Sequence, residues 1–332
     1  MNVFRQPTFS VSVVIPVFNA ADYLEKAVDS ALQQPQVTEV ILVEDGSTDE
    51  SLSICSALSK KHRRVQLLQH PGGQSRGAGA SRNLGILNAA EEFVSFLDAD
   101  DFMLEQRFAK TREVFDAHPD ADGVYEAVGT FFQTERVKAQ WLERGSPLVT
   151  TVLGGIRPDR FFHEQGPIGK SGCIHTNGWT VKRQVFKRSG LFNESLPLHQ
   201  DTDLFIRFAI AGKMYPGEIV APVAMRRVHE NNRITQERTP DEAFVHRIRM
   251  WCAAFSWARE NRYGPQSDII LARLARSCFA AGVYGDERWR PTAIWKRQKQ
   301  AREICPALSV RTLYFGVFTH AFSSLKRKMD IG

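Results

Sequence analysis

Apolar runs alternate with helix-like segments over the first 100 residues of the chain. The runs Ser12–Val17 and Glu39–Val43 are rich in β-branched and aliphatic side chains, which is typical of buried strands. Between them, the apolar residues of Asp22–Leu32 share one face at helical spacing. The alternation continues with a helix at Glu50–Lys61, a strand at Val65–Leu68, a helix at Ala80–Ala90 and a strand at Phe93–Leu97. Strands and helices joined by short loops predict a parallel α/β sheet.

The rest of the chain follows two other patterns. From Glu126 to Lys182 the periodicity weakens, and glycine and proline recur, with a loop at Gly166–Gly178. After Pro240 the pattern becomes helical, and it predicts helices at Asp241–Asn261, Asp268–Ala281, Ala293–Ile304 and Thr312–Lys328. We therefore expect an α/β domain over residues 1–239 and a helical region over residues 240–332, with a boundary near Thr239-Pro240.

Composition places the protein among ordinary globular chains. Its 332 residues are 43% hydrophobic and 24% charged, which excludes fibrous and broadly disordered classes. Arg5, Gln6 and Pro7 interrupt the N-terminus, so we expect no signal peptide. No stretch reaches the roughly 18 apolar residues of a spanning helix. We expect a cytoplasmic protein whose five scattered cysteines are reduced and buried.

Positive charge is concentrated in the C-terminal part. From Asp241 onward the chain carries 16 Lys/Arg against 8 Asp/Glu, whereas the preceding residues carry 27 against 29. The stretch Leu313–Leu325 is amphipathic at helical spacing, and Lys326-Arg327-Lys328 follows it. One hypothesis is peripheral contact with the anionic inner face of a membrane. The alternative is that the apolar stripe packs on the catalytic domain or on a second subunit, so an oligomer stays open.

Polar clusters follow the predicted strands where each strand ends. They are Phe18-Asn19, Glu44-Asp45-Gly46-Ser47 and Asp98-Ala99-Asp100-Asp101. In parallel α/β sheets, ligands bind beyond the carboxyl ends of the strands, so the fold should gather these clusters along one edge.

The pair Asp98 and Asp100 is the first candidate for chemistry. Two carboxylates after a buried strand suit Mg²⁺ or Mn²⁺, which would neutralise the charge on a departing diphosphate. A polar strand-end turn is the alternative.

Asp45 follows another predicted strand, where it could accept hydrogen bonds from a nucleobase or a ribose. The turn after Asp45 could instead serve only to begin a helix, with Ser47 or Asp49 as the cap.

Three further segments are candidates. The glycine-rich stretch Gly72–Gly79 has neither dinucleotide-binding nor P-loop spacing, although Arg76 and Arg82 could meet phosphate. Asp201 precedes an apolar helical start, where it could be a helix cap or a general base. His229 lies in a polar loop, where a lone histidine is more often structural than a ligand.

These pieces, in this order, resemble the inverting glycosyltransferases of family 2, which have the GT-A fold. The matching stretches are Val13–Asn19, Val43–Asp49, Ala80–Ile86, Phe96–Asp101 and Gln200–Arg207. The resemblance covers about Ser10 to Asn232 and is weak in the middle. It implies a GT-A type, Rossmann-like mixed sheet flanked by helices, which the helical C-terminal region follows.

The resemblance also implies a role for each matched residue. Pro16, Phe18 and Asn19 would line the nucleotide pocket, Asp45 would bind the base, and Arg82 would lie near the nucleotide. Asp98 would contact the nucleoside or the donor sugar, and Asp100 would hold the metal with His229. Asp201 would be the catalytic base. Relatives usually carry Glu-Asp where this chain has Gln200-Asp201, and Trp179 is a candidate platform for sugar stacking or a core residue.

The function that follows is metal-dependent glycosyl transfer, of hexosyltransferase type, with Mn²⁺ or Mg²⁺ as cofactor. We expect a nucleotide-sugar donor, most simply a UDP-sugar, a glycan or lipid-linked acceptor, and no nucleic-acid partner. Two alternatives are a sugar-phosphate nucleotidyltransferase and a glycan-binding or scaffold protein with a degenerate site. The segment Val17–Ala20 lacks the glycine- and lysine-rich activating loop that the nucleotidyltransferase needs.

Overall fold

The computed structural model describes residues 9–230, 239–280, 291–306 and 308. The predicted helix Thr312–Lys328 therefore lies outside the described residues. The chain divides into two compact units, Met1–Glu194 with Ala211–Gln236, and Ser195–Ile210 with Glu237–Gly332. The domain boundary expected near Thr239 stays a prediction.

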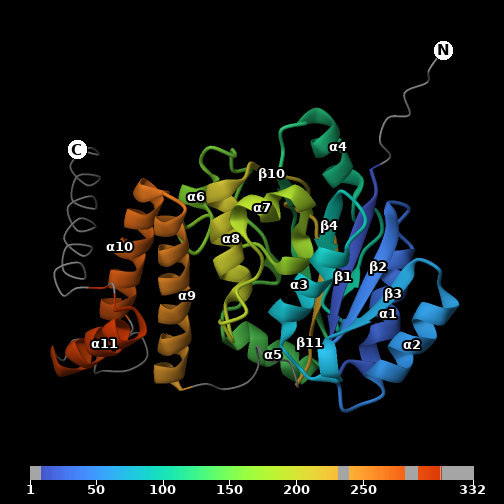
Figure 1. Cartoon of the computed structure of the whole chain (residues 1–332), viewed down its shortest axis with the longest axis horizontal. Helices are drawn as coiled ribbons and strands as arrows, with labels where there is room; N and C mark the ends of the chain where they lie inside the picture. The colour runs from blue at the N-terminus through green and yellow to red at the C-terminus, as the bar shows by residue number, and fades with distance from the viewer. Residues whose placement is uncertain (1–8, 231–238, 281–290, 307, 309–332) are drawn as a thin grey trace. The chain divides into compact units, whose positions relative to one another are not determined.

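A seven-stranded sheet forms the centre of the first unit (Figure 1). Its order is β10-β6-β9-β4-β1-β2-β3. The strands are β1 (Val11–Val17), β2 (Val37–Glu44), β3 (Val65–Gln69), β4 (Phe93–Phe96), β6 (Gly123–Tyr125), β9 (Trp179–Lys182) and β10 (Met214–Pro216). The first four strands along the chain are mutually parallel where they pair, and β9 runs antiparallel to both β4 and β6. The expected parallel arrangement of the first 100 residues is confirmed, within a mixed sheet.

The N-terminal strands form because both faces of the sheet are covered. All residues of β1 are buried except Pro16, which is partly exposed, and five successive residues of β2 from Val40 to Glu44 are buried. Such strands are continuous apolar runs and not alternating ones.

The helices of the first unit are α1 (Ala21–Leu32), α2 (Ser51–Lys61), α3 (Ala78–Asn88), α4 (Ala109–Ala117), α5 (Glu135–Glu143), α6 (Phe161–Glu164) and α7 (Phe186–Ser189). Gly85 lets α3 approach β1 closely, because a Cβ there would lie 2.3 Å from Val14 Cγ1.

A second sheet of four strands, in the order β5-β11-β7-β8, completes the first unit. Its strands are β5 (Phe102–Met103), β7 (Val128–Phe132), β8 (Val149–Thr150) and β11 (Ala224–Val228). Three short 3₁₀ helices lie at Pro71–Gly73 (η1), Thr176–Gly178 (η2) and Arg183–Val185 (η3). The loop Leu97–Asp101 runs from β4 of the first sheet to β5 of the second, so it joins the two sheets.

The second unit is helical. It contains α8 (Gln200–Ala211), α9 (Pro240–Glu260), α10 (Gly264–Ala280) and α11 (Pro291–Ile304), and α9 and α10 pack side by side (Figure 1). Helix α9 begins at a capping box, in which Thr239 Oγ1 accepts from the Glu242 backbone N–H and the Glu242 carboxylate accepts from the Thr239 N–H. The predicted helices in this region agree with α9, α10 and α11 to within a few residues.

Two other expectations concern membrane-spanning helices and the cysteines. No helix in the described ranges has both the length and the apolar character required to cross a bilayer. Four of the five cysteines are buried as expected, but Cys173 is exposed. It lies in the glycine-rich loop before η2.

Candidate active site

The carboxyl ends of β1, β2 and β4 bring three polar loops to one edge of the main sheet. The register aligns Val17 with Glu44 and Val14 with Phe96, so the loops that follow these strands begin at neighbouring positions. The first two loops are joined directly: the Thr48 N–H donates to Asn19 Oδ1 at 2.8 Å, and the Asn19 N–H donates to Ser47 Oγ at 3.1 Å. The edge predicted from the sequence is therefore present.

Phe18 and Pro16 lie at the end of β1. The Phe18 side chain is 52% exposed, which is uncommon for a phenylalanine beside a buried strand, and Pro16 is half-buried opposite Val43. An exposed aromatic ring at this edge offers a flat apolar surface to a planar ligand.

Asp45 holds the glycine-rich segment. Its carboxylate accepts hydrogen bonds from Ser75 Oγ at 2.9 Å and from the backbone N–H groups of Arg76 at 2.7 Å and Gly77 at 2.8 Å. The side chain is only 3% exposed. Gly46 permits this approach, because its φ is +74° and a Cβ there would lie 2.8 Å from the Ser75 nitrogen. Within the described residues, Asp45 therefore organises the turn before α3.

Arg82 and Asp98 form an ion pair at the end of β4. Arg82 projects from α3, is 8% exposed, and donates to Asp98 Oδ1 at 2.5 Å. The Asp98 side chain is 29% exposed, so it reaches solvent while the Arg82 guanidinium holds it in position. The cation lies beside the carboxylate, where it also increases the positive potential available to a phosphate.

Asp101, the last residue of the same loop, is buried. Its Oδ1 accepts from the Arg227 backbone N–H at 2.7 Å, and its Oδ2 accepts from Asn177 Nδ2 at 2.6 Å. Burial, followed by the charges of Asp100 and Asp98, raises the pKa of the Asp101 carboxyl well above its usual range. This group therefore anchors the loop.

Asp100 and His229 are brought together from positions 129 residues apart. His229 Nε2 lies 3.3 Å from Asp100 Oδ2, and their side chains are 11% and 29% exposed. Arg227 supports the pair, because its Nε donates to the Asp100 carbonyl oxygen at 2.9 Å. The Tyr23 ring lies 5.0 Å from the His229 ring and beneath the Arg227 guanidinium.

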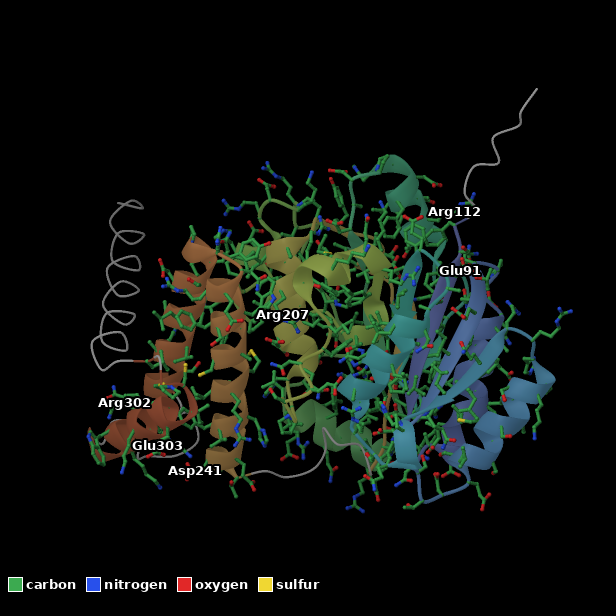
Figure 2. The ribbon with its side chains drawn as sticks, viewed as in Figure 1. Glu91, Arg112, Arg207, Asp241, Arg302 and Glu303 are labelled. Carbon is green, nitrogen blue, oxygen red and sulfur yellow. The ribbon has the colours of Figure 1, made fainter. Side chains whose placement is uncertain are left out.

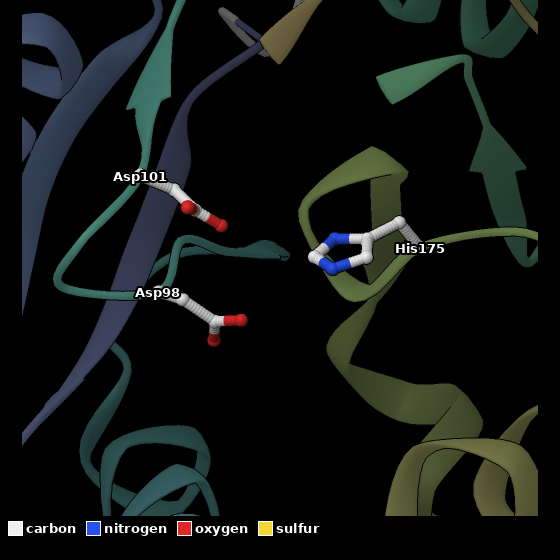
Figure 3. Close-up of side chains that lie close together, drawn as sticks. All are labelled: Asp98, Asp101 and His175. Atoms are coloured by element: carbon white, nitrogen blue, oxygen red, sulfur yellow. The ribbon is translucent and has the colours of Figure 1, made fainter. Parts of the chain in front are cut away.

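A second histidine, His175, faces the carboxylates from the other side. Asp98, Asp101 and His175 offer ligand atoms within 4.8 Å of one another, and Figure 3 shows both carboxylates pointing toward the imidazole. However, His175 Nδ1 accepts a hydrogen bond from the Asn177 N–H at 3.3 Å. The neutral ring then carries its proton on Nε2, which makes Nε2 a donor and not a metal ligand.

The donor atoms present can hold a hard divalent cation. Asp100 combines a partly solvent-exposed carboxylate with an adjacent imidazole nitrogen, and such oxygen and nitrogen ligands suit Mn²⁺ and Mg²⁺. Both oxygens of Asp101 already accept strong hydrogen bonds in a buried position. Asp100 with His229 is therefore a better ligand pair than Asp101 with His175.

Asp201 lies in the second unit, in the first turn of α8. It is partly exposed, and its Oδ1 accepts from the Thr202 N–H at 2.8 Å. Its neighbour Asp203 is 1% exposed and is bound by Arg207, which is labelled in Figure 2, through an ion pair at 2.6 Å. Asp203 is therefore engaged in an ion pair within α8, and Asp201 is the carboxylate of this turn that reaches solvent.

Several residues that build the site were absent from the sequence-based assignment. His175 and Asn177 belong to the weakly patterned middle of the chain, and Arg227 belongs to the polar loop that was noted only for His229. Asp101 was adjacent to the assigned pair but had no role. Trp179, in contrast, is fully buried between Tyr125 and Phe161, so the core alternative is correct and sugar stacking on this ring is excluded.

The chain is similar to several known proteins. A Haemophilus influenzae protein named "Uncharacterized glycosyltransferase" is 40% identical over 101 residues, covering 30% of this chain and 40% of the relative. The succinoglycan biosynthesis protein ExoU of Rhizobium meliloti is 30% identical over 214 residues, covering 62% of this chain and 58% of ExoU. The chain thus spans about two fifths and three fifths of these relatives.

Among solved structures, S. aureus TarS 1-349 in complex with UDP-GlcNAc superposes with a TM-score of 0.57 at 16% identity, covering 89% of both chains. The fold is therefore of the GT-A type. The family model described as Glycosyl transferase family 2 matches residues 12–188, which is more than half of the 332 residues. By that match, the chain belongs to glycosyl transferase family 2.

Proposed function

We propose that this chain is a metal-dependent, inverting glycosyltransferase that moves a sugar from a UDP-sugar to an acceptor hydroxyl. The observation that carries the proposal is the loop Asp98–Asp101, which presents two partly exposed carboxylates beside Arg82 and His229. The carboxylates suit a divalent metal ion, and the buried Arg82 guanidinium beside them suits a phosphate group. The loop therefore suits a diphosphate that is bound together with a metal ion.

The donor would lie along the edge formed by β1, β2 and β4. The exposed ring of Phe18 would stack on the base, and Asn19 would fix the loop from which that ring projects. Asp45 would shape the pocket wall through the turn at Ser75–Gly77. The choice of UDP follows the structure of TarS 1-349 in complex with UDP-GlcNAc.

Asp100 and His229 would hold the divalent cation. When bound there, the cation supplies charge neutralisation for the diphosphate leaving group. Arg82 would bind a phosphate oxygen from its position against Asp98, and Asp98 would accept a hydrogen bond from a donor hydroxyl.

Asp201 would act as the general base. Its carboxylate takes the proton from the acceptor hydroxyl, whose oxygen forms a bond to the anomeric carbon as the bond to the diphosphate breaks. Attack opposite the leaving group inverts the anomeric configuration. Asp201→Asn is nearly isosteric and cannot take the proton, so turnover should fall by roughly 10²–10⁴, while UDP affinity stays the same. Wild-type turnover in this variant would assign the base to another group.

The acceptor is proposed to be a glycan or a lipid-linked glycan at a membrane surface. The support is the positive charge after Asp241 and the face of α11, where Trp295 is 61% exposed and Lys299 Nζ lies 5.8 Å from its ring centre. Each basic residue near an anionic leaflet contributes about 1 kcal/mol to binding. Sedimentation with phosphatidylserine vesicles but not with neutral ones is the expected result, and equal sedimentation with both would exclude an electrostatic attachment.

The test of the activity is a donor screen with UDP-, GDP- and dTDP-sugars, in which nucleotide release is measured with Mn²⁺ and with EDTA. We expect release from UDP-sugars only with the metal. Asp100→Ala should abolish the Mn²⁺-dependent part of UDP binding in calorimetry while the melting temperature changes little, since the side chain is partly exposed. Metal-stimulated formation of a nucleotide sugar from a nucleoside triphosphate would instead favour the nucleotidyltransferase, and no nucleotide binding at all would favour the scaffold alternative.

A further inference from the structure

One fully buried side chain connects the separate parts of the candidate site. Asn177 is 0% exposed and lies in the short 3₁₀ helix η2, between His175 and β9. Its side chain and its backbone both make hydrogen bonds, and they reach four other residues. A buried polar group with this many partners is costly to alter, because each lost partner leaves an unsatisfied group.

The side-chain amide spans the carboxylate loop. Asn177 Oδ1 accepts from the Asp98 backbone N–H at 3.1 Å, and Nδ2 donates to Asp101 Oδ2 at 2.6 Å. One amide group thus binds the first and last residues of the loop. Asp100 lies between these two points, so the backbone on both sides of it is held by Asn177.

The backbone of Asn177 makes two more contacts. Its N–H donates to His175 Nδ1, which sets the tautomer described above. Its carbonyl oxygen accepts from Arg107 Nη2 at 2.9 Å. Arg107 is itself fully buried and is paired with Glu126, whose carboxylate also accepts from Thr111 Oγ1 at 2.8 Å. The loop is therefore tied through Asn177 to a buried ion pair in the core.

Asparagine is the residue type that these contacts require. The position needs one acceptor facing a backbone N–H and one donor facing a carboxylate, and the asparagine amide supplies both. Aspartate would place a second carboxylate against Asp101, and leucine would leave the Asp98 N–H and the Asp101 oxygen without their partner.

We propose that Asn177 is a positioning residue of this enzyme, which fixes the spacing of Asp98 and Asp101 and the tautomer of His175 so that Asp100 is aimed at the donor. The proposal rests on the proposed glycosyl transfer. It predicts that exchanging the donor and the acceptor within the Asn177–Asp101 pair preserves the site, whereas altering either partner alone does not.

The experiment is a double-mutant cycle on the whole chain. Asn177→Asp leaves two acceptors facing each other. Asp101→Asn leaves one carbonyl oxygen for two N–H donors, so its amino group faces either the Asn177 amino group or the Arg227 N–H. In the double variant, the amide introduced at position 101 can donate to the carboxylate introduced at position 177 and still accept from the Arg227 N–H. The carboxylate at position 177 still accepts from the Asp98 N–H. Each single variant should lose about 10- to 100-fold in kcat, which is typical when a group that orients a ligand is altered. The double variant should recover most of that loss.

Asp122→Asn is the matched control. Asp122 is also buried, accepts from Arg188 and from the Lys213 N–H, and precedes β6 at the opposite end of the sheet from the candidate site. We expect this variant to lower the melting temperature without changing kcat or the KM for the donor. A fall in stability alone therefore does not reproduce the effect at Asn177.

The outcomes separate the two proposals. If the double variant is no more active than the product of the two single effects predicts, or if either single variant keeps the kcat of the wild type, the positioning role is wrong. If the single variants do not fold, a double variant that also fails to fold contradicts it. If the wild-type chain binds no nucleotide and releases none from any donor, it is the proposed function that fails.

Discussion

Two stretches of the first unit meet at the loop Asp98–Asp101, and they are built in opposite ways. Residues 11–97 form long apolar strands with polar loops, and they supply side chains that reach solvent, such as Phe18 and Asn19. Residues 107–182 form short strands, and they hold buried charged and polar groups, such as Arg107, Glu126 and Asn177. The first stretch supplies exposed side chains of the candidate site, and the second holds that site in place through buried contacts. Substitutions of exposed residues in the first stretch should therefore change ligand affinity, whereas substitutions of buried residues in the second should change stability.

The largest expected effect on stability comes from the buried ion pair in the second stretch. Arg107→Met should lower the free energy of unfolding by about 3–5 kcal/mol, because it leaves the Glu126 carboxylate buried without its cation. Denaturation in urea measures the loss. Lys110→Ala breaks an exposed ion pair with Glu113 three residues further along and should leave the transition midpoint unchanged. Equal effects of the two variants would mean that the buried ion pair contributes no more to the free energy of unfolding than the exposed pair does.

A smaller loss is expected at Gly178, where the backbone of η2 lies against residue 126. A Cβ at this position would lie 2.2 Å from the Glu126 carbonyl oxygen, so Gly178→Ala forces the backbones apart at a cost of about 1–3 kcal/mol. Gly264→Ala is the control, since its Cβ would meet nothing within 4 Å. Thermal melting should show a loss only in the first variant. A stable Gly178→Ala protein would show that this contact can relax.

In the first stretch, Phe18→Ala should change binding and not stability. The ring is 52% exposed, so its removal should leave the melting temperature within the error of the wild type. Stacking of a base on an aromatic ring contributes about 1–3 kcal/mol, so UDP affinity measured by calorimetry should fall by roughly 5- to 150-fold. Phe18→Tyr retains the stacking surface and serves as the control. Unchanged affinity in the alanine variant would place the base elsewhere.

The smallest effect is a difference in thiol reactivity. Burial, together with the nearby charges of Glu44 and Asp49, raises the pKa of Cys55 to about 12, so almost no thiolate is present at pH 8. Cys173 in the second stretch is exposed. Iodoacetamide at pH 8 should label Cys173 and spare Cys55, as measured by peptide mass spectrometry, and both should react in guanidinium. Labelling of Cys55 in the native protein would show that the first stretch opens locally.

The sequence predicted the first stretch well because its strands are buried on both faces. Continuous apolar runs marked β1, β2 and β4 to within two residues at each end. It did not predict β6 or β9, which have three and four residues and lie among glycines, so no periodicity identifies them. Tertiary pairing with β4 makes β9 a strand.

The same distinction applies to the site. Asp98 and Asp100 were recognised from the acidic motif after a buried strand, and His229 was assigned only through the family resemblance. The structure brings Asp100 and His229 together. Asn177 and Arg227 act through contacts across 76 and 126 residues, and no local pattern reports such a contact. Asp45 illustrates the converse, since its place at the end of β2 is evident from the sequence but the turn at Ser75–Gly77 that occupies its carboxylate is not.

The contact between Asp101 and the Arg227 backbone has a consequence for the synthesis of the protein. Residue 227 is made 126 residues after Asp101, and at roughly 5–20 residues per second a ribosome needs about 6–25 s for that interval. During this time the emerging chain already contains every carboxylate of the loop but not the strand that holds Asp101 and Asp100 in place. Nascent chains of this protein therefore acquire the folded form of the loop Asp98–Asp101 only when the last strand of the second sheet joins it.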